Sequence, residues 1–385
     1  MSIFAEAIGA DAAGASDNGR APEHESRTRA SRVRSEVAYE LVGSLAAATC
    51  LMWVVFTLAV GSAPVGQGVC TLVAFFTIYA LVAWQRHGVL HMKDQLATAF
   101  IWFGALCALV PLVAILAYLL VKGGIVLLSH FPHFLVHDNS QAGPSDPYTR
   151  AGVLAAVVGT IEQVGIATLV TVPIAIMTAT FLNETRNGFA RAVQMVVDAM
   201  TGTPEIIAGL FVYLLWVVPR GVNGKSGMAA AMALSVMMLP FVTRAAQEVL
   251  RIVPGSLREA ALALGAPQWR VVLKIVIPTA RAGLVTVAIL GVARAVGETA
   301  AVLFTAGGSA NAHVNWNPFH GIQVNLPLYV FQFATSSSNK QVQEGWGAAL
   351  VLMLFVLVLF ALARLIGSSK PGRRLAPWGR GRGGA

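Results

Sequence analysis

Eight long apolar segments restrict the possible folds of this chain more than any other feature. Apolar residues make up 56% of the 385 residues, charged residues only 12%, and the mean hydropathy is +0.69. A helix needs about 20 mainly apolar residues to cross a hydrocarbon core of roughly 30 Å. The pattern therefore predicts an all-α polytopic membrane protein with about eight transmembrane helices. The expected spans are Tyr39–Val60, Gly68–Trp84, Leu96–Val121, Ala151–Leu182, Ala192–Val218, Met228–Leu250, Ala282–Ala306 and Trp346–Ile366.

Lysine and arginine predict which ends of the spans face the cytoplasm. With an even number of spans both termini lie on one side, and that side carries 20 Lys and Arg residues against five on the other. Because cytoplasmic segments are enriched in these residues, both termini are expected in the cytoplasm. The formal net charge of +9 then reflects orientation and contact with anionic membrane lipid, and no soluble basic face suggests nucleic-acid binding.

Composition divides the chain into four expected parts. Residues 1–38 are polar without an apolar period, which is typical of a disordered tail and unlike a cleavable signal peptide. Residues 39–94 are expected to form a transmembrane hairpin, and residues 95–367 a core of six spans. Residues 368–385 are rich in Gly, Pro and Arg and are expected to form a basic cytoplasmic tail.

Two expected external segments, 122–150 and 307–345, are long and carry aromatic residues, Asn and Pro. They can either contact a soluble delivery protein or rest on lipid headgroups, and the sequence leaves both open. Neither a disulfide framework nor a metal site is expected, because the three cysteines fall in three different spans and Pro132 interrupts the nearby histidines. The residues concerned are Cys50, Cys70, Cys107, His130, His133 and His137.

A short amphipathic element separates the sixth and seventh expected spans. Ser256 and Glu259 have the spacing of a capping box, and Gly265 lies where a helix end needs a positive φ. Pro267 can then open a second helix without losing a donor. A helix of two turns is barely stable alone in water, so it is expected to lie against something. The apolar residues on one of its faces are Leu257, Ala261 and Leu264.

This element resembles the EAA loop of ABC-importer permeases, with Ile277 where leucine is usual. The resemblance implies a cytoplasmic coupling helix that docks into a groove on a separate dimer of ATP-binding subunits. ATP and Mg²⁺ would then be bound by those partners, with no cofactor on this chain. The alternative is an ordinary connector between membrane helices. The residues that match the motif are Glu259, Ala260, Ala261, Gly265 and Pro278.

A second resemblance concerns the substrate. Residues 293–306 read ARAVGETAAVLFTA, which is similar to a segment of phosphate-specific permeases of the PstA type, with Ala301 and Val302 where Pro and Leu are usual. The likeness covers about 95–367 and is densest over 226–306. It implies the type I ABC importer (MetI-like) fold and import of inorganic phosphate across a bacterial plasma membrane. It also implies two further partners, a second permease subunit and an extracytoplasmic phosphate-binding protein.

Other functions stay open at this point. Sulfate and molybdate permeases share the EAA loop and an Arg…Gly-Glu element, so another oxyanion is the alternative substrate. A secondary transporter would explain apolar spans with charges inside them but not the EAA loop. A non-transporting scaffold would fit if those charges only hold helices together.

Arg294 and Glu298 are the leading candidates for the substrate pathway. Arg294 is expected near the middle of a span, where a charge is costly unless it is paired, and Glu298 follows on the same face. A guanidinium suits a tetrahedral oxyanion because its donors match two oxygens. The pair can equally be structural. Arg244 and Glu248 repeat the spacing near the cytoplasmic end, where snorkelling to the interface is the simpler interpretation.

The expected fifth span is interrupted at Thr201–Glu205. Thr203 can cap a half-helix that Pro204 begins, and its free N–H groups suit an anion. Glu205 stands where the PstA-type pattern usually has Ser, and this acid would discourage phosphate there. Glu162 is interpreted as a buried partner of a basic residue, with Arg294 as a candidate.

Overall fold

The computed structural model describes residues 23–57, 64–141, 143 and 151–367. These residues are helical throughout apart from loops and one isolated bridge between Gly307 and Gln323. The chain divides into two units, 1–113 and 114–385, which are described separately. The helices are α1 (Glu23–Val55), α2 (Pro64–Ser129), α3 (His133–Val136), α4 (Leu154–Glu184), α5 (Gly188–Thr201), α6 (Glu205–Val212), η3 (Tyr213–Val217), η4 (Val218–Gly224), α7 (Gly227–Arg251), α8 (Gly255–Ala263), α9 (Gln268–Val271), η5 (Val272–Val276), α10 (Ile277–Val296), α11 (Ala300–Thr305), α12 (Leu326–Ala334) and α13 (Asn339–Gly367).

The first unit contains α1 and the first part of α2. Its small core is aromatic, with the rings of Phe76 and Phe100 stacked at 4.2 Å. Gly88 interrupts α2 with a φ of 81°, a conformation that glycine adopts readily, so the two expected spans on either side become two arms of one bent helix. The bend lies within the expected hairpin region, whereas the compact units meet at residue 113.

The first helix starts earlier than the sequence suggested. Residues 23–38, expected to belong to the disordered tail, are helical within α1, since this stretch contains neither Gly nor Pro to interrupt a helix. The remainder of that expected tail, 1–22, lies outside the described residues, as do the basic tail 368–385 and the end of the expected first span at 58–60. The apolar part of α1 is short, Tyr39–Val55.

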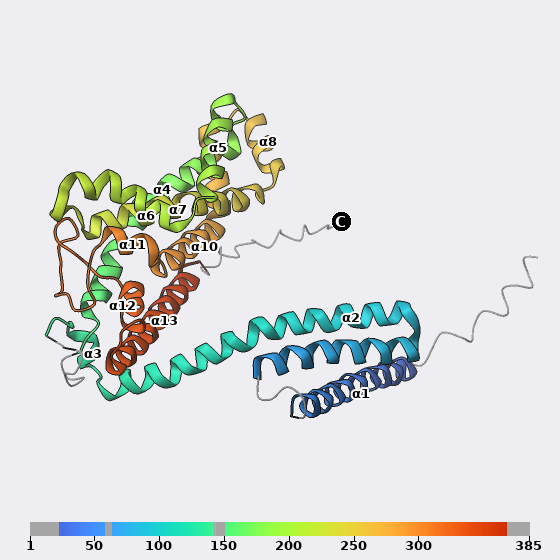
Figure 1. Ribbon diagram of the computed structural model, residues 1–385. Coiled ribbons are helices and arrows are strands. Elements are labelled where there is room, and N and C mark those ends of the chain that lie inside the picture. Colours follow the sequence, from blue (N-terminus) through green and yellow to red (C-terminus); the bar gives the residue numbers. More distant parts are fainter. Residues whose placement is uncertain (1–22, 58–63, 142, 144–150, 368–385) are drawn as a thin grey trace, which may run out of the picture. The chain divides into compact units, whose positions relative to one another are not determined.

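The second unit packs α4 against α7, with α10 lying against both helices and α13 packing on α10 and α12 (Figure 1). The contact between α4 and α7 uses small residues, among them the fully buried Ala156, Ala167 and Ala230. Small side chains let helices approach closely, and this is how membrane helices gain packing energy where lipid is as apolar as the protein. Within this unit α8 lies at one end and α3 at the other.

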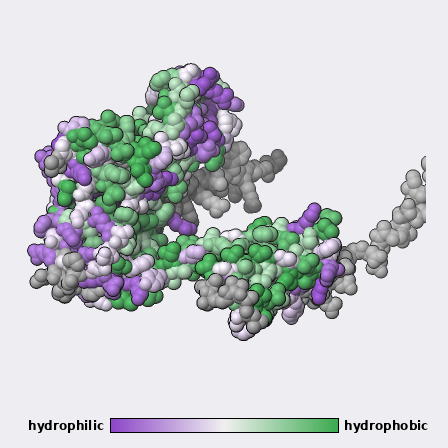
Figure 2. All heavy atoms as spheres, viewed as in Figure 1, coloured by the Kyte–Doolittle hydropathy of each residue, from purple (hydrophilic) through white to green (hydrophobic). Residues whose placement is uncertain are grey.

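Within the described residues, six helical segments are long and apolar enough to span a membrane, and a seventh span results if the bent pair α5 and α6–η4 is counted as one. Together with Tyr39–Val55, these correspond to the eight expected segments. Large apolar side chains remain exposed on them, including Ile101 and Leu169, each more than 70% exposed. Figure 2 shows hydrophobic residues covering much of the helical surface, as a lipid-facing surface requires.

The bounds of the seventh expected span were wrong. The observed span runs from Gln268 to Val296 instead of Ala282 to Ala306. Gly297 ends α10, and the chain turns before starting the short α11 at Ala300. Residues 297–299 therefore form a break in the backbone that the apolar pattern could not reveal.

The expected external segments are partly inside the protein. The α2 helix continues to Ser129 and so includes the first eight residues of the first segment, of which 142 and 144–150 lie outside the described residues. In the second segment, Leu326, Leu328 and Tyr329 of α12 are at most 1% exposed and belong to the main core. The loop that precedes α12 remains accessible, with Trp316 and Phe319 mostly exposed.

Candidate functional site: two breaks in the bundle and a projecting helix

The projecting helix α8 starts at Pro254, not through a capping box. Pro254 is the N-cap residue and no side chain caps the helix, so the expected Ser256–Glu259 capping box was wrong. Helix formation begins at Gly255, because the extended Pro254 already accepts from the N–H of Leu257, and this places Ser256 inside the first turn. Glu259 and Ala260 are exposed.

The end of α8 follows the prediction. Gly265 has a φ of 79°, as expected for a glycine that terminates a helix. The Ala266 N–H donates to the Ala261 carbonyl at 3.1 Å and the Gly265 N–H to the Leu262 carbonyl at 2.9 Å, which together form a Schellman motif. Pro267 then serves as N-cap of α9, and Pro278 lies in the first turn of α10.

The apolar face of α8 does not pack as a whole. Ala261 alone is buried, in a cluster with Val271 and Val276, whereas the other two residues of the expected face stay exposed. Four large apolar residues of α8, its C-cap and α9 are exposed instead, and we call them together the α8 surface. It consists of Leu257, Leu262, Leu264 and Trp269.

An ion pair that sequence reasoning missed ties α8 to the rest of the unit. Arg258 Nη2 lies 3.3 Å from Glu184 Oε1 at the end of α4 and donates to the Leu250 carbonyl at the end of α7 at 3.0 Å. Gln268 of α9 donates to the Glu184 carbonyl at 3.2 Å. Both charged side chains are mostly buried, at 23% and 15% exposed, and through them Arg258 joins α8 to both α4 and α7.

The candidate cation Arg294 lies in the last turn of α10, beside the break at residues 297–299, not in the middle of a span as expected. Its Nη2 donates to Glu205 Oε1 at 2.7 Å, whereas its Nε lies 3.8 Å from Glu298 Oε1. The predicted Arg294–Glu298 pair is therefore present but is the longer of two contacts. The Phe241 ring lies 5.3 Å from the guanidinium carbon, within cation–π range.

A second break brings Glu205 to this place. The α5 helix ends at Thr201, and the chain bends by 106° before α6. The expected cap was wrong, because the Thr203 hydroxyl donates back to the Met200 carbonyl at 2.7 Å and Pro204 is the N-cap. Glu205 follows as the first residue of α6, so its carboxylate also lies in the favourable field of the helix N-terminus.

Close packing of α6 on α11 fixes the distance between the two breaks. A Cβ added to Gly209 would lie 2.6 Å from the Cα of Ala301, so the two backbones touch without any side chain between them. This contact is four residues beyond Glu205 and three beyond Glu298. The arrangement of the three charged groups is thus set by the backbone and not by side-chain reach alone.

Arg244 pairs with a residue of another helix. Its Nη2 lies 2.5 Å from Asp198 Oδ1 on α5, while Glu248 pairs with Arg251 at 3.0 Å. The four-residue spacing of Arg244 and Glu248 therefore produces no pair between them, because α5 packs along α7, where Gln247 also donates to Gln194 at 2.8 Å. The α5 helix contributed no charged candidate to the sequence analysis.

Glu162 was also assigned the wrong partner. Its Oε2 accepts from Gln323 Nε2 at 2.6 Å, so an amide and not Arg294 satisfies it. The same Gln323 nitrogen donates to the Asn315 carbonyl at 3.0 Å, which fastens the 307–325 segment onto α4. A Cβ on Gly227 would overlap the Gln323 side chain, so this fastening needs glycine at the start of α7.

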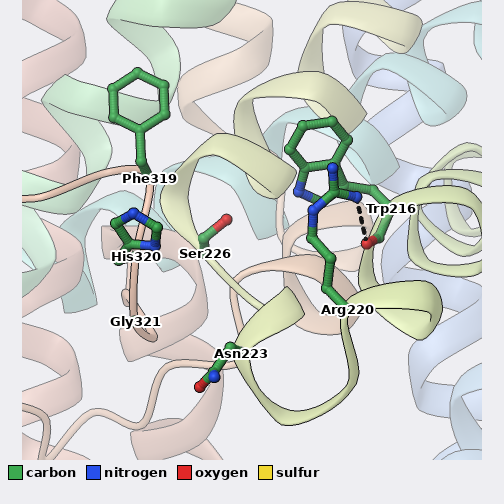
Figure 3. Close-up of a pocket in the computed structure, with 7 residues that line it drawn as sticks. All are labelled: Trp216, Arg220, Asn223, Ser226, Phe319, His320 and Gly321. Carbon is green, nitrogen blue, oxygen red and sulfur yellow. Dashed lines mark hydrogen bonds between the residues drawn. The ribbon is translucent and has the colours of Figure 1, made fainter.

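A cavity of about 780 Å³ opens next to that segment (Figure 3). Arg220 folds back over the Trp216 ring, 3.5 Å from its centroid, and donates to the Trp216 carbonyl at 3.0 Å. Figure 3 shows the Asn223 side chain directed away from this guanidinium, so the polar groups do not converge on one ligand position. The lining residues are Trp216, Arg220, Asn223, Ser226, Phe319, His320 and Gly321.

Nothing in the described part of the chain groups three His, Cys, Asp or Glu side chains as a metal site would. The rings of His133 and His137 stack at 3.8 Å instead. The three cysteines are separate and exposed.

Comparison with known proteins gives a consistent result. A family model described as "Binding-protein-dependent transport system inner membrane component" matches residues 171–369. The chain is 37% identical over 287 residues to "Phosphate transport system permease protein PstA 1" of Mycobacterium tuberculosis, covering 74% of this chain and 91% of the relative. It is 38% identical over 228 residues to "Phosphate transport system permease protein PstA" of Haemophilus influenzae, covering 59% of this chain and 79% of the relative.

A solved structure shares the fold. It is a chain of a bacterial alginate ABC transporter, described as in complex with an alginate pentasaccharide-bound periplasmic protein. The TM-score is 0.51 at 14% sequence identity, and the match covers 72% of this chain and 95% of the other.

Proposed function

Because the chain belongs to the family of binding-protein-dependent transport system inner membrane components, we propose that it is the membrane-spanning permease subunit of an ATP-driven importer of inorganic phosphate. The observation that carries this proposal is the identity of 37% over 91% of a relative named as a phosphate transport system permease. The chain is a multi-pass membrane protein and a transport component. It supplies the pathway, while ATP and Mg²⁺ are bound and ATP is hydrolysed on partner subunits.

Arg294 is the proposed contact for the oxyanion. It is half exposed beside two backbone breaks, and broken helices are tolerated at membrane depth only where they are buried in protein or line a cavity. A guanidinium can donate two parallel hydrogen bonds to a tetrahedral oxyanion. Glu298, whose side chain is 9% exposed, contacts Arg294 from the buried side and is proposed to orient it.

Arg244 and Thr203 complete the proposed pathway. Arg244 supplies a second cation and is 46% exposed next to Asp198. The Thr203 hydroxyl already donates to Met200, but its oxygen can still accept a hydrogen bond from a protonated phosphate oxygen.

The α8 helix is the proposed coupling element. Glu259, Ala260, Ala261, Gly265 and Pro278 are its motif residues, and the α8 surface presents four large apolar side chains for docking. Such a surface suits a groove on an ATP-binding subunit, because burying exposed leucines contributes about 25 cal/mol per Å². Movement of α8 then reaches α4 and α7 through Arg258.

The complete transporter is proposed to contain an ATP-binding subunit dimer, a second phosphate permease subunit and an extracytoplasmic phosphate-binding protein. Both termini and α8 are proposed to lie in the bacterial cytoplasm, and the excess of Lys and Arg on that side supports this orientation. The loop with Trp316 and Phe319 lies on the opposite side and is the part available to the binding protein.

Uptake of radiolabelled phosphate into vesicles that contain the whole complex tests the proposal. Uptake is expected to require the binding protein and ATP, and an excess of sulfate is expected not to compete. Sulfate or molybdate competing as well as phosphate would make this an importer of another oxyanion. Uptake that survives ATP depletion while the proton gradient is intact would indicate a secondary transporter, and no uptake at all would leave a scaffold.

A further inference from the structure

The carboxylate of Glu205 is hydrogen-bonded to the guanidinium of Arg294, which is the group proposed to bind the transported anion. Arg294 Nη2 donates to it at 2.7 Å, and this is a charge-assisted hydrogen bond of ordinary length. Glu298 is more distant from the same guanidinium, at 3.8 Å. Glu205 is therefore the closer of the two anionic groups that Arg294 contacts in this structure.

The two acids differ in exposure, and this separates their roles. The Glu298 side chain is 9% exposed, whereas those of Glu205 and Arg294 are 47% and 46% exposed. A buried acid cannot be exchanged easily for a ligand from solution. An accessible acid can, because an exposed ion pair contributes little and its partners are readily rehydrated.

Glu205 is not needed to hold the site together. Pro204 is the N-cap of α6, so the Glu205 side chain forms no cap of its own helix. The position of α6 is set by its backbone contact with α11 at Gly209 and Ala301, and Figure 1 shows these two helices side by side next to α10. When Glu205 turns away, Arg294 keeps Glu298 and the Phe241 ring as supports.

From these contacts we propose that Glu205 is a built-in competitor of the transported oxyanion, which displaces its carboxylate from Arg294 on binding. The proposal rests on the proposed function, since it takes Arg294 as a phosphate contact. A tethered carboxylate neutralises the guanidinium between transport cycles and returns to it when the anion leaves. It therefore weakens anion binding and favours release, as a transporter requires.

Binding of radiolabelled inorganic phosphate to the purified whole complex, without the binding protein, tests the proposal. Glu205→Gln removes the competing charge at nearly constant shape and is expected to tighten phosphate binding about two- to fivefold, fivefold being about 1 kcal/mol. Glu205→Asp keeps the acid at the start of α6 but shortens its reach, and it is expected to tighten binding as well. Arg294→Gln is expected to abolish binding.

The matched control is Glu248→Gln, which removes another exposed acid, paired with Arg251 on α7. It is expected to leave phosphate binding unchanged. Equal tightening by this control would overturn the proposal, because the effect would then be one of net charge. The proposal would also be overturned if both Glu205 variants bound phosphate no more tightly than the parent complex. It would likewise be overturned if Arg294→Gln bound phosphate as tightly as the parent complex.

Uptake by the parent complex with its binding protein separates this inference from the proposed function. A parent complex that imports no phosphate refutes the function. A parent complex that imports phosphate while Glu205→Gln binds it no more tightly refutes only the role of Glu205.

Discussion

Replacing Arg258 by glutamine is expected to uncouple ATP hydrolysis from transport. Arg258 joins α8 to Glu184 at 3.3 Å and to the Leu250 carbonyl at 3.0 Å, and its side chain and that of Glu184 are mostly buried. The substitution leaves the Glu184 carboxylate without its charged partner. Loss of a partner by a buried polar group costs about 1–3 kcal/mol, and more for a charged one.

This free-energy cost weakens the attachment of α8 to α4. At about 1.4 kcal/mol per factor of ten, 1–3 kcal/mol reduces the population in which α8 is joined to α4 by roughly 5- to 150-fold. The ATP-binding subunits can still close on α8, but their movement reaches the bundle less often. Phosphate uptake should therefore fall more than ATP hydrolysis, and the number of phosphate ions imported per ATP should drop.

The assay measures uptake and ATP hydrolysis on the same vesicles. Arg270→Gln is the matched control, since Arg270 is an exposed arginine of α9 that lies over Trp269 at 5.3 Å. The double variant Glu184→Gln with Arg258→Gln removes the unpaired charge and should lose less coupling than Arg258→Gln alone. A coupling ratio for Arg258→Gln equal to that of Arg270→Gln, or strictly additive losses in the double variant, would refute the reasoning.

Three further outcomes are expected. Gly265→Ala forces a non-glycine residue to a φ of 79° and should lower the local stability of the α8 turn by about 1–2 kcal/mol. Faster proteolytic cleavage at α8 would measure this loss. The control Gly255→Ala should not change the cleavage rate, because Gly255 has no positive φ and the nearest atom to an added Cβ is 4.0 Å away. Gly209→Ala places a Cβ 2.6 Å from the Cα of Ala301 and should lower uptake by forcing α6 and α11 apart, which displaces the two breaks that flank Arg294, while Gly165→Ala, with open space around it, should leave uptake intact. Partial burial raises the pKa of Asp138, but hydrogen bonds from Ser140 and Val314 outweigh it and hold that pKa below its usual range. Since the folded-state pKa is lower than the unfolded-state pKa, ionised Asp138 stabilises the protein above about pH 3.9, and this stabilisation is lost as the pH falls through the folded-state pKa. Asp138→Asn should therefore reduce the fall of the thermal unfolding temperature at acid pH. An unchanged fall in the variant would show that it has another origin.

Much of the fold was predictable because lipid imposes one requirement on every span. Backbone groups within a bilayer must be satisfied by the helix itself, so a run of about 20 apolar residues already specifies its structure. Local chemistry was predictable for a similar reason. Gly265 ended α8 as expected, since the motif is closed by hydrogen bonds within six residues.

Partners distant in sequence were not predictable. Spacing suggested Glu298 for Arg294, and this contact is present, but Glu205 of α6 lies closer to Arg294. Arg244 pairs with Asp198 of α5, and Glu162, for which a basic partner was expected, accepts from Gln323 of a loop. Spacing of four residues brings two side chains onto one face but does not prevent a neighbouring helix from offering a closer partner.

The sequence by itself determined that this protein is a bundle of membrane-spanning helices with a short projecting helix closed at Gly265, because these features depend on hydrophobicity and on backbone conformation within a few residues. Only the tertiary structure decided which charges meet. Two breaks, at residues 202–204 and 297–299, are brought together by the contact of Gly209 with Ala301, and this places Glu205 on Arg294. Such a contact joins residues about 90 positions apart, and its energy arises only after the helices have packed.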